Sequence, residues 1–146
     1  MKSRRFAALF MGAVLPFALS APVHAATTIK GAAILDNPCG KVSVKQMGLV
    51  HAGKFEEGNK LTTKEMQDEW KAMPAKDRTM MSGMAKEMSQ TEAQYAADIK
   101  ANGVLVVDGP AATLTVKKET KDKNGTSTST MTQRFKLDGN ECLISR

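Results

Sequence analysis

Histidine, cysteine and aromatic residues are scarce in this chain of 146 residues, and each scarcity excludes a kind of site. The chain has two histidines, two cysteines, five phenylalanines, one tryptophan and one tyrosine. His24 and three of the phenylalanines lie within the first 25 residues. Without that segment His51 is the only histidine, so no site can use two. The remaining aromatic residues are too few for extended stacking on nucleic-acid bases, and they are Phe55, Trp70, Tyr95 and Phe135.

The net charge is also low once the first 25 residues are set aside. The whole chain carries 21 Lys and Arg against 15 Asp and Glu, a formal charge of +6. Lys2, Arg4 and Arg5 belong to the first segment, which holds no acidic residue, so the rest of the chain carries 18 − 15 = +3. A charge this small gives no uniform positive field, and we expect no nucleic-acid partner.

The first 25 residues have the form of a cleaved export signal. A basic head is followed by an apolar stretch from Phe6 to Leu19, and Val23-His24-Ala25 is a small-x-small cleavage site. The apolar stretch is shorter than the roughly 20 residues that cross a bilayer, so no membrane span is expected. We therefore expect a signal peptide over residues 1–25 and a single domain over 26–146, in a bacterial periplasm or secreted beyond it.

Cys39 and Cys142 are the only cysteines, and an exported chain places them in an oxidising compartment. A disulfide between them is the direct interpretation. A redox-active pair would have the C-x-x-C spacing, whereas these two are 103 positions apart. The predicted bond is therefore structural.

Short strands are predicted at the start of the domain. Residues 26–35 are mildly apolar, and residues 36–40 form a cluster of turn-forming residues around Pro38. Residues 41–45 alternate between polar and apolar, which is typical of a half-buried strand that continues toward Val50.

Two or three helices are predicted over residues 62–101. Thr62 with Glu65, and Ser89 with Glu92, have the spacing of a capping box. Pro74 separates the first two helices, and Asn102-Gly103 ends the last one.

Six methionines lie in these helices at helical spacing, and they are Met66, Met73, Met80, Met81, Met84 and Met88. Thioethers suit Cu(I), but no histidine accompanies them, and the spacing favours a core or a partner-binding face. We therefore expect no metal site, and keep copper handling as an alternative.

A four-stranded antiparallel meander is predicted from Gly103 to Ser145. The alternating segments are 103–108, 111–117, 126–137 and 141–145, and Asn124-Gly125 is a strong hairpin turn. The predicted fold class is α+β, with short N-terminal strands, two or three Met-rich helices and this meander. The apolar face of the sheet is expected to lie under the Met-rich helices.

No catalytic motif is present, so the chain is predicted not to be an enzyme and to need no cofactor. His51 has no nucleophile or acid near it in a triad-like pattern, and the adjacent carboxylates Glu56-Glu57 and Asp68-Glu69 do not face each other on a helix.

A cluster of lysines marks the predicted hairpin tip. Four lysines within seven residues on a projecting turn form a local positive charge that steers an acidic protein partner. The predicted partner-binding residues are Lys117, Lys118, Lys121, Lys123 and Arg134.

The order of a signal, a short helical segment and a disulfide-tied meander resembles that of small periplasmic inhibitor and immunity proteins. The meander runs from Gly103-Val104-Leu105-Val106-Val107 to Asn140-Glu141-Cys142-Leu143-Ile144. The resemblance implies a protein that blocks an antibacterial toxin, such as one delivered by a neighbouring cell's secretion system, or an envelope enzyme. Two alternatives stay open: a copper-handling protein that uses the methionines, and a small-ligand or lipid binder that uses the concave face of the sheet.

Overall fold

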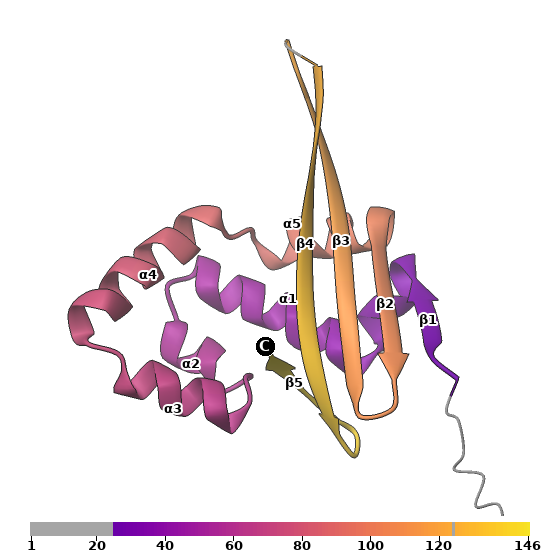
Figure 1. The fold of residues 1–146 in the computed structure, drawn as a ribbon. Coiled ribbons are helices and arrows are strands. Elements are labelled where there is room, and N and C mark those ends of the chain that lie inside the picture. The colour runs from indigo at the N-terminus through magenta and orange to yellow at the C-terminus, as the bar shows by residue number, and fades with distance from the viewer. Residues whose placement is uncertain (1–24, 124) are drawn as a thin grey trace, which may run out of the picture.

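The structure is a computed structural model that describes residues 25–123 and 125–146. The predicted signal peptide, apart from Ala25, and Asn124 of the predicted hairpin turn lie outside the described residues. Helices and a single antiparallel sheet make up the fold (Figure 1), so the predicted α+β class is confirmed.

The sheet has five strands in the order β1-β2-β3-β4-β5. Strands β2 to β5 are the predicted meander, and the N-terminal strand pairs with β2 at its edge. The first and the last strand therefore form the two edges of the sheet. The strands are β1 (Thr27–Lys30), β2 (Gly103–Asp108), β3 (Ala111–Asp122), β4 (Gly125–Asp138) and β5 (Glu141–Ser145).

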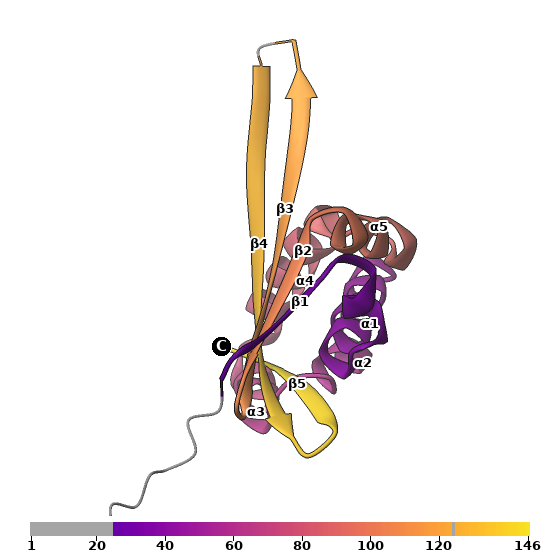
Figure 2. The same cartoon turned by 90° about the vertical axis from the view of Figure 1, so that its right-hand side faces the viewer.

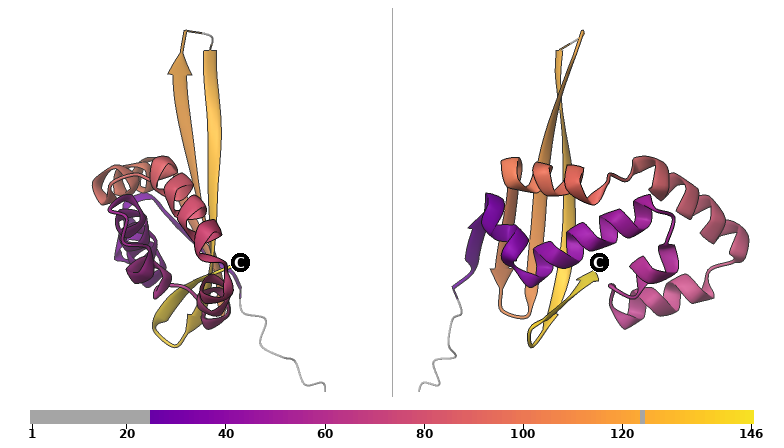
Figure 3. Two further views of the ribbon diagram at one scale, coloured as in Figure 1. Left: turned by 90° about the vertical axis from the view of Figure 1, so that its left-hand side faces the viewer. Right: turned by 180° about the vertical axis from the view of Figure 1, so that it is seen from behind.

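Five α-helices and one 3-10 helix lie between β1 and β2. They are η1 (Gly31–Asp36), α1 (Pro38–His51), α2 (Phe55–Asn59), α3 (Lys64–Ala72), α4 (Ala75–Met88) and α5 (Glu92–Asn102). Helices α1 and α5 lie on one side of the sheet (Figure 2). Helices α3 and α4 extend to the side of it (Figure 3), and neither contains a buried residue. The expectation that the Met-rich helices cover the sheet is therefore wrong.

The core lies between the sheet and the two covering helices. Tyr95 and Ile99 of α5 are fully buried against Leu114 of β3 and Phe135 of β4. On β3 the buried positions alternate with positions nearer the solvent, as the sequence pattern predicted. The buried apolar residues are Ile34, Cys39, Tyr95, Ile99, Leu105, Ala112, Leu114, Val116, Phe135, Cys142 and Ile144.

The strand predicted over residues 41–50, and the turn over 36–40 before it, are wrong, because this segment forms helix α1. The Asn37 side chain caps the helix by accepting a hydrogen bond from the Cys39 backbone N–H at 2.9 Å, and Pro38 occupies the first turn. Cys39 and Ser43, one turn apart, are both buried on the face toward the sheet. The burial period is therefore that of a helix.

Both predicted capping boxes are also misplaced. The N-cap of α3 is Thr63, and its side chain makes no capping hydrogen bond. A complete capping box is present at α5, but it joins Thr91 to Gln94, two residues after the predicted position at Ser89.

Within residues 25–123 and 125–146, none of the helices combines the length and apolarity needed to cross a bilayer.

Candidate functional site

The most exposed part of the sheet is the hairpin formed by β3 and β4. Strand β2 pairs with β3 no further than Val116, and β5 pairs with β4 only from Arg134 onward. Residues 117–123 and 125–131, called the projecting hairpin below, therefore pair only with each other within the sheet; their base contacts α5, and the hairpin extends from there beyond the helical layer (Figures 1 and 2). Every side chain in it whose exposure the structure describes is exposed. This ribbon leaves both of its faces open to contact.

The predicted partner-binding lysines lie on both faces of the projecting hairpin. Lys117 and Lys121 are four residues apart on β3, so they share one face with Glu119 between them. Lys118 lies on the other face, where its Nζ is 3.8 Å from Oδ2 of Asp98 on α5. Asp98 of α5 therefore offsets the charge of Lys118 but not that of Lys117 and Lys121, which lie on the opposite face.

Lys123 and Arg134 lie at opposite ends of the hairpin strands. Lys123 is in the turn that follows β3, whereas Arg134 is paired with Thr113 and with Ser145 in the body of the sheet. Arg134 is eight positions along β4 from Thr126, or roughly 26 Å at the usual strand rise of about 3.3 Å per residue. Thr130, which pairs with Lys117, is four positions from Arg134, whereas Lys117 is six positions from Lys123. The structure therefore places Lys121 and Lys123 near the tip and Lys117 between the tip and Arg134.

A groove lies where the projecting hairpin meets the helices. Its volume is about 370 Å³. Its polar side chains already have partners, since Asp98 accepts a hydrogen bond from Gln90 at 2.9 Å and faces Lys118. The groove is lined by Met88, Gln90, Tyr95, Asp98, Val116, Lys118, Ser129, Thr130 and Met131. The surface it offers to a ligand is mainly apolar.

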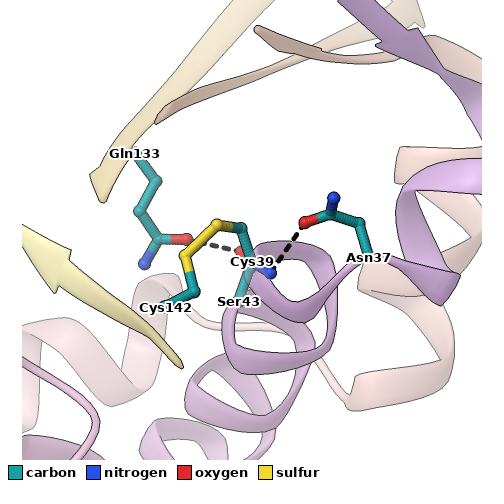
Figure 4. The surroundings of a disulfide bond; sticks show 5 residues. All are labelled: Asn37, Cys39, Ser43, Gln133 and Cys142. Atoms are coloured by element: carbon teal, nitrogen blue, oxygen red, sulfur yellow. Dashed lines mark hydrogen bonds between the residues drawn. A yellow bond between two sulfur atoms is a disulfide. The ribbon is translucent and has the colours of Figure 1, made fainter. Parts of the chain in front are cut away.

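A chain of neutral hydrogen bonds runs beneath the sheet next to this groove. The Ser43 hydroxyl of α1 lies 3.2 Å from the Tyr95 hydroxyl and also contacts Oε1 of Gln133 on β4 (Figure 4 shows the second contact). A hydroxyl has one proton, so Ser43 donates to Gln133 and accepts from Tyr95. Gln133 in turn donates to Oε1 of Gln46 at 2.8 Å.

Burial raises the pKa of Tyr95 above its ordinary value. The Ser43 hydroxyl opposes this shift, because it can rotate to donate to the ionised phenol oxygen, and the Asp98 carboxylate raises the pKa further. Tyr95 is therefore neutral at physiological pH. The chain of hydrogen bonds locks α1, α5 and β4 together by donors and acceptors that are all paired, so its role is structural.

The predicted disulfide is confirmed, and it lies beside this hydrogen-bond chain. Cys39 of α1 and Cys142 of β5 are bonded, with their Cα atoms 5.1 Å apart (Figure 4). Both are almost completely buried. The bond fixes the first turn of α1 to the last strand.

His51 lies on the surface and is not part of a catalytic arrangement among the described residues. Its Nδ1 is 3.3 Å from the Ser89 hydroxyl, which donates to the Lys86 backbone carbonyl at 2.6 Å. In residues 25–123 and 125–146, no carboxylate is hydrogen-bonded to the imidazole ring to orient it as a base.

The methionines of α4 are exposed, so the core alternative of the prediction is wrong for them, and the partner-binding face stays a prediction. The exposed fractions are 60% for Met80, 47% for Met81, 57% for Met84 and 79% for Met88. Their helical spacing was recognised correctly, but the spacing alone does not reveal which side of a helix faces the protein.

Sequence reasoning did not find a second cavity, which lies between α2, α3 and α4 and has a volume of about 380 Å³. Phe55, Trp70 and Arg78 line it, and Trp70 Nε1 donates to Glu56 Oε1 at 3.1 Å. These residues are far apart in the sequence, and no motif connects them.

Comparisons with protein-family models, with curated proteins and with solved structures find no match to this chain. The functional argument therefore depends on the geometry described above.

Proposed function

We propose that this chain is an exported, non-catalytic binding protein that docks a protein partner through the projecting hairpin. The observation that carries the proposal is the exposure of the described side chains of residues 117–123 and 125–131. A two-stranded hairpin is marginally stable alone in water, and this one meets α5 only near its base, at Lys118, while beyond that its two strands pair only with each other. A contact with a partner surface would stabilise the ribbon.

The charge distribution supports an acidic partner. Residues 117–123 of β3 and its turn hold four lysines, Lys117, Lys118, Lys121 and Lys123, against Glu119 and Asp122, a formal balance of 4 − 2 = +2, while β4 has no charged residue from Gly125 to Gln133. Positive groups on a projecting element increase the rate of encounter with a negative surface more than they stabilise the final complex. The uncharged strand then provides the contact itself.

The resemblance in plan to inhibitor and immunity proteins supports the class of partner, an antibacterial toxin or an envelope enzyme whose active surface the hairpin would occlude. The test begins with the proteins encoded next to this chain's gene. Each is produced, its toxicity is measured with and without this chain, and association rates are compared at low and high ionic strength.

The decisive variant is Lys121→Glu/Lys123→Glu, with Arg134→Glu as the matched control. The double variant should associate more slowly than the wild type, mainly at low ionic strength. Arg134→Glu should have a smaller effect because it lies roughly 26 Å from the tip. Equal association rates for the wild type and the double variant would contradict the proposal.

The groove favours a second candidate, binding of a small apolar ligand. Its lining combines Met88, Val116 and Met131 with the ring of Tyr95, and its polar groups are already paired. Native mass spectrometry of protein purified from the exporting cell tests this candidate. A ligand that adds mass to the wild-type protein and is absent from the Val116→Gln variant would support this candidate. A wild-type protein with no bound ligand would reject it.

A further inference from the structure

The exposed methionines of α4 have no role in the core or in the proposed hairpin contact, and one of them, Met88, also lines the groove. Helix α4 contains no buried residue, and Met80, Met81, Met84 and Met88 are between 47% and 79% exposed. Among the described residues, the other large hydrophobic side chains with comparable exposure are Val106 and Met131, both in the sheet. Four thioethers are therefore concentrated on one helix without a packing reason.

These four side chains lie on one side of the helix. At 3.6 residues per turn, their directions fall within an arc of about 100°. Met84 is the central member, because Met80 and Met88 are four residues from it and Met81 is three. Side chains at these spacings are neighbours, with Cβ atoms about 5–6 Å apart, and the flexible methionine side chain lets the sulfurs converge.

The composition of this stripe indicates a soft metal. A surface that binds proteins commonly mixes aromatic residues and arginine with methionine, whereas all four apolar members here are thioethers. Thioethers are soft ligands that select Cu(I) over the harder divalent ions. Among the described residues no group of three or more His, Cys, Asp or Glu side chains is placed to hold a metal, so no alternative site of that kind competes for the ion.

We propose that α4 binds one Cu(I) ion through Met84 together with two of Met80, Met81 and Met88. The binding involves no electron transfer and breaks no covalent bond. Both cysteines are in the buried disulfide, so no thiolate takes part. This site is centred on Met84 and uses none of the hairpin lysines, so it goes beyond the proposed function.

The experiment uses the disulfide-bonded chain from Ala26 and two probes. Ag(I) is a soft ion that needs no reductant, and Cu(I) is then tested without oxygen against a coloured Cu(I) chelator. Methionine methyl groups are followed by NMR. One ion should bind per chain, and the signals of the four α4 methionines should shift while those of Met47, which packs against the core, stay in place.

Substitutions by leucine, which has a similar volume, remove the sulfur alone. Met84→Leu should weaken Ag(I) and Cu(I) binding by more than about tenfold, because it removes the shared ligand. Met80→Leu and Met88→Leu should each have a smaller effect. Met66→Leu is the matched control, a half-buried methionine on α3 outside both the stripe and the groove, and should bind as the wild type does.

Two results would overturn the proposal. One is an affinity in the wild type no higher than in a variant with all four α4 methionines replaced by leucine. The other is equal loss from Met66→Leu and Met84→Leu. Circular dichroism confirms that each variant is folded. The Lys121→Glu/Lys123→Glu variant should still bind the metal, so failure of the hairpin proposal and failure of this one are distinguishable.

Discussion

Removal of the disulfide should strongly destabilise this domain. The bond spans a sequence separation of 103 residues. In the chain-entropy model, a loop of about 100 residues gives a contribution of roughly 4.7 kcal/mol at 25 °C. Measured values are usually lower, so we expect the double variant Cys39→Ala/Cys142→Ala to lose about 3–5 kcal/mol. Total stabilities of small domains are about 5–15 kcal/mol, so this loss is a large fraction of the whole.

Urea unfolding followed by circular dichroism measures this loss in the oxidised wild type, the reduced wild type and the double variant. The reduced wild type separates the effect of the bond from that of the substitutions, because it keeps both sulfur atoms in the core. Both cysteines are buried, so the two alanines also remove some packing. The double variant should therefore be slightly less stable than the reduced wild type.

The reasoning would be refuted by equal unfolding midpoints and equal slopes for the oxidised and reduced wild type. That result would mean that the reduced unfolded chain is already as restricted as the bonded one, contrary to the loop-closure argument.

Three further predictions concern single residues. Because the folded-state pKa of Tyr95 is raised, its contribution to stability is complete below about pH 10 and is lost as pH rises through the folded pKa. The free energy of unfolding should therefore decline less steeply with pH in Tyr95→Phe than in the wild type. The absorbance of the chain's single tyrosine measures its titration directly. Gly40→Ala should lower the free energy of unfolding in urea by about 1–3 kcal/mol, because the added Cβ would overlap the Ile34 carbonyl oxygen. Gly83→Ala on α4 is the control, and it should be neutral or stabilising because the space around Gly83 is open. Thr91→Ala should cost about 1 kcal/mol by removing the capping box of α5, as thermal unfolding will measure.

The meander was predictable because the local sequence of its strands and turns has the pattern typical of a hairpin. Residues 111–117 and 126–137 alternate, and the turns between strands contain glycine. Buried Leu114 and Phe135 occupy the predicted face. One side of each strand meets the core, so a period of two is enough to identify both the strand and its orientation.

Helix α1 was not predictable in the same way, because polar residues occupy its buried face. Ser43 is fully buried and Gln46 is partly buried, and each is satisfied by a side chain distant in sequence, Tyr95 or Gln133. These partners are visible only in three dimensions. The apolar period of 3.6 is therefore interrupted, and the alternation of residues 41–45 suggested a strand instead.

Part of the candidate site was also predictable from local sequence and part was not. The lysines near the tip were predictable because Lys121 and Lys123 belong to a local cluster at a turn signal. Exposure of the α4 methionines was not predicted, because it depends on α3 and α4 extending beside the sheet instead of covering it. The groove joins residues of α4, α5, β3 and β4, and only the packing of these elements creates it.

The disulfide also determines how the domain responds to a mechanical pull on its two ends. Cys39 follows the first strand and Cys142 precedes the last residues of β5, so nearly all of the sheet and every α-helix beyond the first turn of α1 lie inside the covalent loop. Tension would unpair β1 and the end of β5 and then pass through the sulfur bridge. When fully extended at about 3.4 Å per residue, the segments outside the covalent loop span roughly 60 Å, whereas the whole domain without the disulfide would span roughly 400 Å. A force that strips β1 from the sheet edge would therefore leave the meander, the groove and α4 carrying no load.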